Sequence, residues 1–214
     1  MNFSAEVRLD TYPEDVEEAR LVGRARQGDQ AAWEGLVRQY QTHLFRLAYL
    51  ILRDAAEAED AAQEAFVRAF LSLETYDAER PFRPWLTRIA VNMARNRRRS
   101  VGRYLAQLRR LLEKTPAPSV GGNQTEQAIQ QRQQAERLWQ AVQRLNGIGQ
   151  EVIYLRYFLD MSEAEMAEAL DVAPGTVKSR LHRALGRLRL VIDEEFPALR
   201  AGWERDEPVA EPER

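Results

Sequence analysis

The stretch MSEAEMAEALDVAPGTVKSRLHRALGRLR, Met161 to Arg189, predicts two helices joined by a short turn. Ser162 and Glu165 have the spacing of a capping box, in which each side chain bonds the backbone N–H of the other residue and a helix begins. Residues 171–173 are short enough for the turn of a helix-turn-helix, and Pro174 suits the first position of the second helix. Together these features predict a DNA-binding helix pair.

The second helix of this pair separates an apolar stripe from a basic face. No Asp or Glu occurs between Asp171 and Asp193. Cationic side chains attract phosphates, and arginine can bind guanine edges bidentately, so this face suits duplex DNA. The alternative is a solvated basic helix of an ordinary bundle, which the capping box, the short turn, the proline and the acid-free face together disfavour. The predicted stripe is Val177, Leu181, Leu185 and Leu188, and the predicted outward face is Thr176, Lys178, Ser179, Arg180, Arg183 and Arg187.

Composition limits the classes of protein to which the chain can belong. The 214 residues carry a formal net charge of −2 and include no cysteine, which rules out disulfides and cysteine–zinc sites within the sequence. With only His43 and His182, we also expect no histidine metal site, no other metal and no cofactor. No apolar run is long enough to span a membrane, so we expect no membrane insertion and a cytoplasmic protein.

A second cationic segment lies near the middle of the chain. The interval from Arg80 to Arg110 contains ten arginines and no acidic residue. A helix that starts at Pro84 would place a polar face of arginines and asparagines beside the loop 75–83, which holds Tyr76 and Phe82. Guanidinium and amide groups flanked by aromatic rings suit single-stranded or opened nucleic acid. A solvated face is the simpler alternative.

The helix predicted from Ala55 to Leu73 carries an unusually polar face. Asp54 and Glu57 form a cap signature at its start, and Phe66 and Phe70 are expected to face inward. The polar face contains Asp60, Gln63 and Glu64. From composition alone, plain solvation and docking onto a basic partner are equally acceptable interpretations.

The whole chain is predicted to be all-α, with two helical domains joined by a flexible linker. The linker is assigned from the prolines and glycines of KTPAPSVGGNQ, and Asn146-Gly147 is expected to stop the first helix of the second domain. The predicted organisation is a leader at 1–14, a first domain at 15–112, a linker at 113–124, a helix-turn-helix domain at 125–192 and an acidic tail at 193–214.

Three blocks in this order resemble the extracytoplasmic-function (ECF) sigma factors of bacterial RNA polymerase, a two-domain branch of the sigma-seventy family. The blocks are DAAEAEDAAQEAFVRAF (54–70), RPFRPWLTRIAVNMARNRRR (80–99) and SEAEMAEALDVAPGTVKSRLHRALGRLR (162–189). The similarity covers about 29–99 and 135–190, whereas the acidic leader and tail lie outside it. The resemblance implies a transcription initiation factor with a sigma2-like and a sigma4-like domain.

The resemblance also implies partners and roles for individual residues. The partners are promoter DNA and the beta and beta-prime subunits of core RNA polymerase, and family members are often held inactive by an anti-sigma factor, which makes such a factor a candidate partner. The implied polymerase contacts are Glu57, Asp60, Gln63, Glu64 and Arg68. The implied contacts to the opened minus-ten element are Thr75, Tyr76, Asp77, Phe82, Arg83, Arg88, Asn92, Arg95, Asn96 and Arg98. The implied contacts to the duplex minus-thirty-five element are Pro174, Gly175, Thr176, Lys178, Ser179, Arg180, Arg183 and Arg187.

Two classes of protein other than a sigma factor remain as alternatives. An autonomous helix-turn-helix regulator would sense a ligand with residues 29–99 and bind symmetric duplex sites unaided. An RNA-binding structural protein would prefer RNA hairpins. An enzyme is disfavoured because the sequence offers no nucleophile–base pair, no phosphate-binding glycine loop and no metal cluster. The arginine helix favours the sigma factor, since a ligand-sensing domain does not need it.

Overall fold

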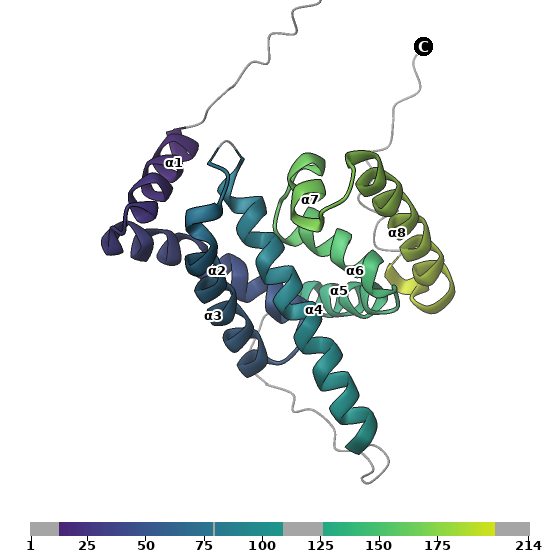
Figure 1. Cartoon of the computed structure of the whole chain (residues 1–214). Coiled ribbons are helices and arrows are strands. Elements are labelled where there is room, and N and C mark those ends of the chain that lie inside the picture. Colours follow the sequence, from purple (N-terminus) through teal and green to yellow (C-terminus); the bar gives the residue numbers. More distant parts are fainter. Residues whose placement is uncertain (1–12, 79, 109–125, 200–214) are drawn as a thin grey trace, which may run out of the picture. The chain divides into compact units, whose positions relative to one another are not determined.

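The computed structural model describes residues 13–78, 80–108 and 126–199, and all regular secondary structure in these ranges is helical (Figure 1). The chain divides into two compact units. Helices α1 to α4, as far as Gly102, belong to the first unit. Helices α5, α6, α8 and most of α7 belong to the second. The all-α, two-domain prediction is confirmed, while the predicted linker, most of the leader and the end of the tail lie outside the described residues.

The described residues of the first unit form four α-helices, and local sequence signals mark where α2 and α3 begin. Asp29 caps α2 by accepting the Ala32 N–H at 3.1 Å, and Asp54 caps α3 by accepting the Glu57 N–H at 2.9 Å. Gly28, at φ +87°, takes the left-handed conformation between α1 and α2. The elements are α1 (Pro13–Arg26), α2 (Gln30–Leu52), α3 (Ala55–Ser72), a 3₁₀ turn (Leu73–Thr75) and α4 (Phe82–Leu108).

The core of the first unit is built on α2. This helix buries Leu36, Leu44 and Leu47 almost completely. Helix α3 contributes small side chains, and Ala58 and Ala61 pack against Ala48 of α2. Small residues let the two helix backbones approach closely, which leaves the polar side of α3 directed outward.

The second unit contains α5 (Glu126–Gln143), α6 (Gly147–Ile153), a π-helical turn (Tyr154–Phe158), α7 (Glu163–Leu170) and α8 (Pro174–Glu195). Asn146 differs from its predicted role, because it caps the start of α6 by accepting the Gly149 N–H at 2.8 Å instead of ending the preceding helix. The buried Gln150 side chain then donates to the Leu145 carbonyl at 2.9 Å. The corner between α5 and α6 is therefore closed by side-chain hydrogen bonds.

Helix α8 continues past the predicted domain boundary at residue 192. It ends at Glu195, and Leu199 packs with Ala141, Val191 and Ile192 in an apolar cluster. The ordered domain thus includes the first part of the expected acidic tail. None of the helices within the described ranges is long and apolar enough to cross a membrane.

Candidate nucleic-acid and protein interfaces

The helix-turn-helix forms as the sequence predicts. The Glu165 N–H donates to Ser162 Oγ at 3.2 Å, and the Ser162 N–H donates to Glu165 Oε2 at 2.8 Å, which completes the capping box at the start of α7. Asp171 at φ 56° turns the chain out of α7, and Asp is among the few residues that tolerate this conformation. Pro174 then occupies the first turn of α8. The local sequence therefore fixes where α8 begins.

The basic side of α8 is open to solvent in the second unit. Thr176 and Arg180 are half-buried, and the other predicted duplex-binding residues, Pro174, Gly175, Lys178, Ser179, Arg183 and Arg187, are exposed. The predicted apolar stripe is wrong at one position, because Leu185 is 39% exposed and Ala184 is buried instead. Burial follows Val177, Leu181 and Ala184, since these residues lie on one side of the helix.

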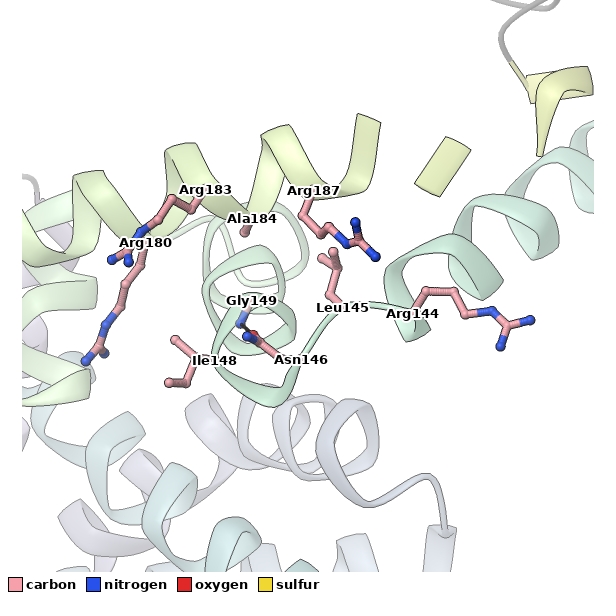
Figure 2. Close-up of a pocket in the computed structure, with 9 residues that line it drawn as sticks. All are labelled: Arg144, Leu145, Asn146, Ile148, Gly149, Arg180, Arg183, Ala184 and Arg187. Carbon is pink, nitrogen blue, oxygen red and sulfur yellow. Dashed lines mark hydrogen bonds between the residues drawn. The ribbon is translucent and has the colours of Figure 1, made fainter. Parts of the chain in front are cut away.

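A groove of about 560 Å³ runs along the basic side of α8 (Figure 2). Arg180, Arg183 and Arg187 line it from α8, while Arg144 and Asn146 line it from the α5–α6 corner. Sequence reasoning missed these last two residues, because nothing in the local pattern indicates which helix the corner approaches. The Arg144 Nε also lies 2.9 Å from Glu195 Oε2, so an anion in the groove would compete with Glu195 for Arg144.

Close packing of α6 against α8 shapes this groove. A Cβ atom at Gly149 would lie 3.2 Å from Asn146 Oδ1 and 3.6 Å from Ala184 Cβ. The first distance is tighter than an ordinary contact, so glycine makes room for the Asn146 cap, whereas the distance to Ala184 of α8 is an ordinary van der Waals contact. The two small residues thereby hold the α5–α6 corner next to the cations of α8.

The polar face of α4 is the second candidate nucleic-acid surface. Asn92 and Asn96 are exposed, and Arg88, Arg95 and Arg98 are half-buried. Within the helix, Arg99 donates to Asn96 Oδ1 at 2.7 Å. These five predicted minus-ten residues therefore lie on one helix, in one described unit.

The loop before α4 differs from the prediction in one important way. Tyr76 and Phe82 are only 5% and 2% exposed, so both rings pack in the interior of the unit and are not available to stack on a base. Their contact with the minus-ten element stays a prediction. Both pack with Trp85, at centroid distances of 4.7 and 5.4 Å. Burial, the largest cause, raises the pKa of the Tyr76 hydroxyl, which donates to the Arg80 carbonyl.

The aromatic cluster therefore anchors the loop, while other loop residues remain accessible. Thr75 and Asp77 are exposed, and Arg83 is half-buried. Thr75 Oγ1 donates to the Ser72 carbonyl at 3.0 Å, which holds the start of the loop against the end of α3. Of the predicted loop contacts, these three can still reach a ligand.

Beneath α4 lies a buried polar network that sequence reasoning did not predict. The Thr87 hydroxyl is fully buried and donates to the Arg83 carbonyl at 2.7 Å, which leaves its oxygen to accept from His43 Nε2 at 3.1 Å. Burial, followed by the charges of Arg83 and Arg46, lowers the pKa of His43 from 6.5 to about 4. The imidazole is therefore neutral at physiological pH.

The acidic side of α3 is not a free anionic surface. Arg97 of α4 extends toward it and bonds Glu57, with Nη2 at 2.6 Å from Asp60 Oδ2 and Nη1 at 3.7 Å from Glu64 Oε2. The hydrogen bond with Glu57 is the largest cause that raises the pKa of Arg97. Glu64 is shared, because Arg68 Nη2 lies 3.2 Å from its other oxygen. The structure therefore brings three of the predicted polymerase contacts, Glu57, Asp60 and Glu64, together around Arg97, a cation that the prediction did not include.

Apolar side chains accompany these charges on the outer side of α3. A shallow groove of about 400 Å³ lies between α2 and α3 and is lined by Phe45, Phe66 and Gln63 among others. Phe70, which was predicted to face inward, is 52% exposed and contacts the Trp33 ring at 5.3 Å between centroids. Val67 and Leu71 are also exposed. Such a mixed apolar and charged face is typical of protein interfaces.

Comparison with known proteins matches both units. The family model described as Sigma-70 region 2 matches residues 36–104, and the model described as Sigma-70, region 4 matches residues 135–188. The chain is 33% identical over 175 residues to the ECF RNA polymerase sigma factor SigW of Bacillus subtilis, covering 79% of this chain and 94% of SigW. It belongs to the ECF branch of the sigma-70 family. This sigma factor is accordingly a transcription initiation factor and not an enzyme.

Further relatives match the sigma factor over most of its length. It is 33% identical over 177 residues to SigL of Mycobacterium tuberculosis, covering 82% of this chain and 97% of SigL. The solved structure of CnrH in complex with the cytosolic domain of CnrY gives a TM-score of 0.61 at 26% identity, covering 84% of this chain and 99% of CnrH. RpoE of Bartonella quintana, solved with the anti-sigma factor NepR, shares the fold with a TM-score of 0.56 at 21% identity.

Proposed function

We propose that this sigma factor binds core RNA polymerase in the cytoplasm and directs it to promoters by reading two elements in different states. The second unit would read the minus-thirty-five element as duplex, and the first would hold the minus-ten element as an opened strand. The observation that carries the proposal is that the cationic faces of α4 and α8 lie within the stretches matched by sigma-70 regions 2 and 4, respectively.

Helix α8 supports duplex reading through its exposed polar side chains. Arg180 is the residue we assign to a base edge, because arginine can bind guanine bidentately in the major groove. The groove beside it, lined also by Arg183 and Arg144, suits the phosphate backbone that flanks such a contact. Arg144 would then extend the duplex-binding surface beyond the helix-turn-helix.

Helix α4 supports capture of an opened strand. Asn92 and Asn96 offer amide donors and acceptors, and the neighbouring Arg95 and Arg98 offer charge to the strand backbone. Because Tyr76 and Phe82 are buried, we assign base contacts in the loop to Thr75, Asp77 and Arg83 instead. Holding an unstacked base costs a few kcal/mol, which these contacts must offset.

Helix α3 supports the contact with polymerase. Glu57, Asp60 and Glu64 lie on its polar side, with Gln63 and the apolar groove between α2 and α3 close by. A partner with basic and apolar groups would complement both features. CnrH and RpoE have been solved with the cytosolic domain of CnrY and with NepR, so we also propose that an anti-sigma factor regulates this chain.

The deciding experiment is in vitro transcription with core polymerase and genomic promoter fragments. Addition of the protein should produce discrete new start sites, whereas core polymerase alone should produce none. A chain that neither binds core polymerase nor creates any start site would refute the proposal. The autonomous-regulator alternative predicts instead that the protein protects symmetric duplex sites without polymerase.

A further inference from the structure

The guanidinium group of Arg97 forms ion pairs with the same carboxylates that the proposed polymerase contact requires. Its three guanidinium nitrogens face Glu57, Asp60 and Glu64, with 2.6 Å to Asp60 and 3.7 Å to Glu64. Arg97 is 28% exposed, whereas Asp60 is 60% exposed. The cation therefore lies partly beneath an acidic group that a partner can still reach from solvent.

Helix geometry separates Arg97 from the nucleic-acid face of α4. Successive residues of an α-helix are rotated by about 100°, so Arg97 is on the opposite side of α4 from Arg95 and Arg99, each two residues away. Arg97 turns toward α3, whereas Arg99 bonds to Asn96 on its own helix. Arg97 thus belongs to the protein-binding side of the unit and not to the strand-binding side.

The charge around Arg97 is partly neutralised within the free chain. Glu57, Asp60 and Glu64 supply three negative charges, while Arg97 and Arg68 supply two positive charges close to them. A cationic side chain of a partner meets a weaker field than three unpaired carboxylates would produce. To bond Asp60 and Glu64 it must share them with Arg97 or displace it.

We propose that Arg97 is an internal counter-ion that competes with core polymerase for the carboxylates of α3, so that docking replaces its contacts with Asp60 and Glu64. This inference rests on the proposed polymerase contact and adds how that contact is regulated. In the free protein Arg97 holds the carboxylates against α4 and screens them. In the complex, cationic groups of the polymerase take over Asp60 and Glu64. Affinity is therefore lower than the acidic sequence of α3 alone would give.

The test is the affinity of the full-length protein for core polymerase, measured without DNA for wild type, Arg97→Gln and Arg99→Gln. Arg97→Gln should bind about twofold to fivefold more tightly at low salt, the size expected for release of partly exposed ion pairs. The gain should shrink as salt rises, because exposed charges are screened. Arg99→Gln removes the same charge from the same helix without touching the acids, so its affinity should equal that of wild type.

Each outcome separates this inference from the proposed function. A wild-type protein that fails to bind core polymerase refutes the proposed function itself. If wild type binds and Arg97→Gln binds equally or more weakly, Arg97 does not compete, and the inference is overturned. Equal tightening in Arg97→Gln and Arg99→Gln would reduce the effect to net charge and also overturn it.

Thermal unfolding of each variant checks that α3 and α4 remain folded. If Arg97→Gln does not fold, Arg97→Lys takes its place in the test. Lysine keeps the charge but presents a single ammonium group, which cannot match three carboxylates as a planar guanidinium does. Arg97→Lys should therefore also bind core polymerase more tightly than wild type, and unchanged or weaker binding would count against competition.

Discussion

His43 is kept neutral by the interior of the first unit. Its ring contacts the Tyr40 ring edge to face, and its Nε2 bonds to the buried hydroxyl of Thr87. Protonation would place a third cation beside Arg83 and Arg46 in a site that has little access to water. The same interior that positions the start of α4 therefore resists acidification of this histidine.

The lowered pKa of His43 makes the stability of the first unit depend on pH. Because the folded-state pKa is about 4 and the ordinary value is 6.5, the unfolded chain binds more protons between these values. The contribution is fully present above pH 6.5 and is lost as the pH falls toward 4. From about pH 7.5 to about pH 5, the free energy of unfolding should drop by about 2 kcal/mol more in wild type than in His43→Gln.

Urea unfolding followed by circular dichroism at several pH values measures this difference. Glutamine keeps an N–H donor for Thr87 but does not titrate. His182 lies exposed on α8, so His182→Gln serves as the control and should retain the full acid-induced loss. Identical pH profiles for wild type and His43→Gln would show that the buried histidine does not control this dependence.

At the scale of helices, local signals predicted most of the fold. Caps at Asp54 and Ser162 predicted the starts of α3 and α7 because a helix start depends on its immediate neighbours in sequence. It was harder to predict which residues of each helix face the core. Phe70 and Leu185 follow the helical spacing of the apolar residues on their helices, but both are exposed. The buried stripe of each helix is narrower than this apolar spacing suggests.

The candidate sites also include residues that the sequence predicted and residues that it did not. The basic face of α8 could be predicted because it lies on one helix. The positions of Arg97 and Arg144 could not, because each depends on which neighbouring element its side chain reaches. The burial of Tyr76 and Phe82 could not be predicted, since an aromatic ring near a polar loop suits both base stacking and core packing, and only the three-dimensional contacts decide between them.

The capping box at the start of α7 should contribute measurably to the second unit. Ser162→Ala removes the hydroxyl that accepts the Glu165 N–H and leaves this donor at the helix start without its partner. We expect the free energy of opening, measured by hydrogen exchange at the α7 amides, to fall by about 1 kcal/mol. Glu165→Gln keeps an acceptor for the Ser162 N–H and should lose less. Equal losses in the two variants would contradict the reciprocal geometry.

At the scale of the whole molecule, a formal net charge of −2 conceals surfaces of opposite sign. The cationic faces of α4 and α8 lie in different units, and the acidic side of α3 is partly neutralised by Arg97. Local fields, not the total charge, determine which ligand each surface attracts. A chain that is close to neutral can therefore carry nucleic-acid and protein interfaces at once.

If the two units read separate promoter elements, substitutions in each should affect initiation independently. Arg180→Ala should weaken binding to a promoter by about 1 to 3 kcal/mol, and this loss should vanish on DNA with a scrambled upstream element. Asn96→Ala should instead lower the permanganate reactivity of the opened minus-ten strand while leaving upstream protection intact. The two residues lie in different units, so the free-energy losses of the double variant, measured from initiation rates, should add within about 0.5 kcal/mol. A larger deviation would mean that the units do not act as separate readers, and an Arg180→Ala loss that persists on scrambled DNA would reduce that contact to a phosphate.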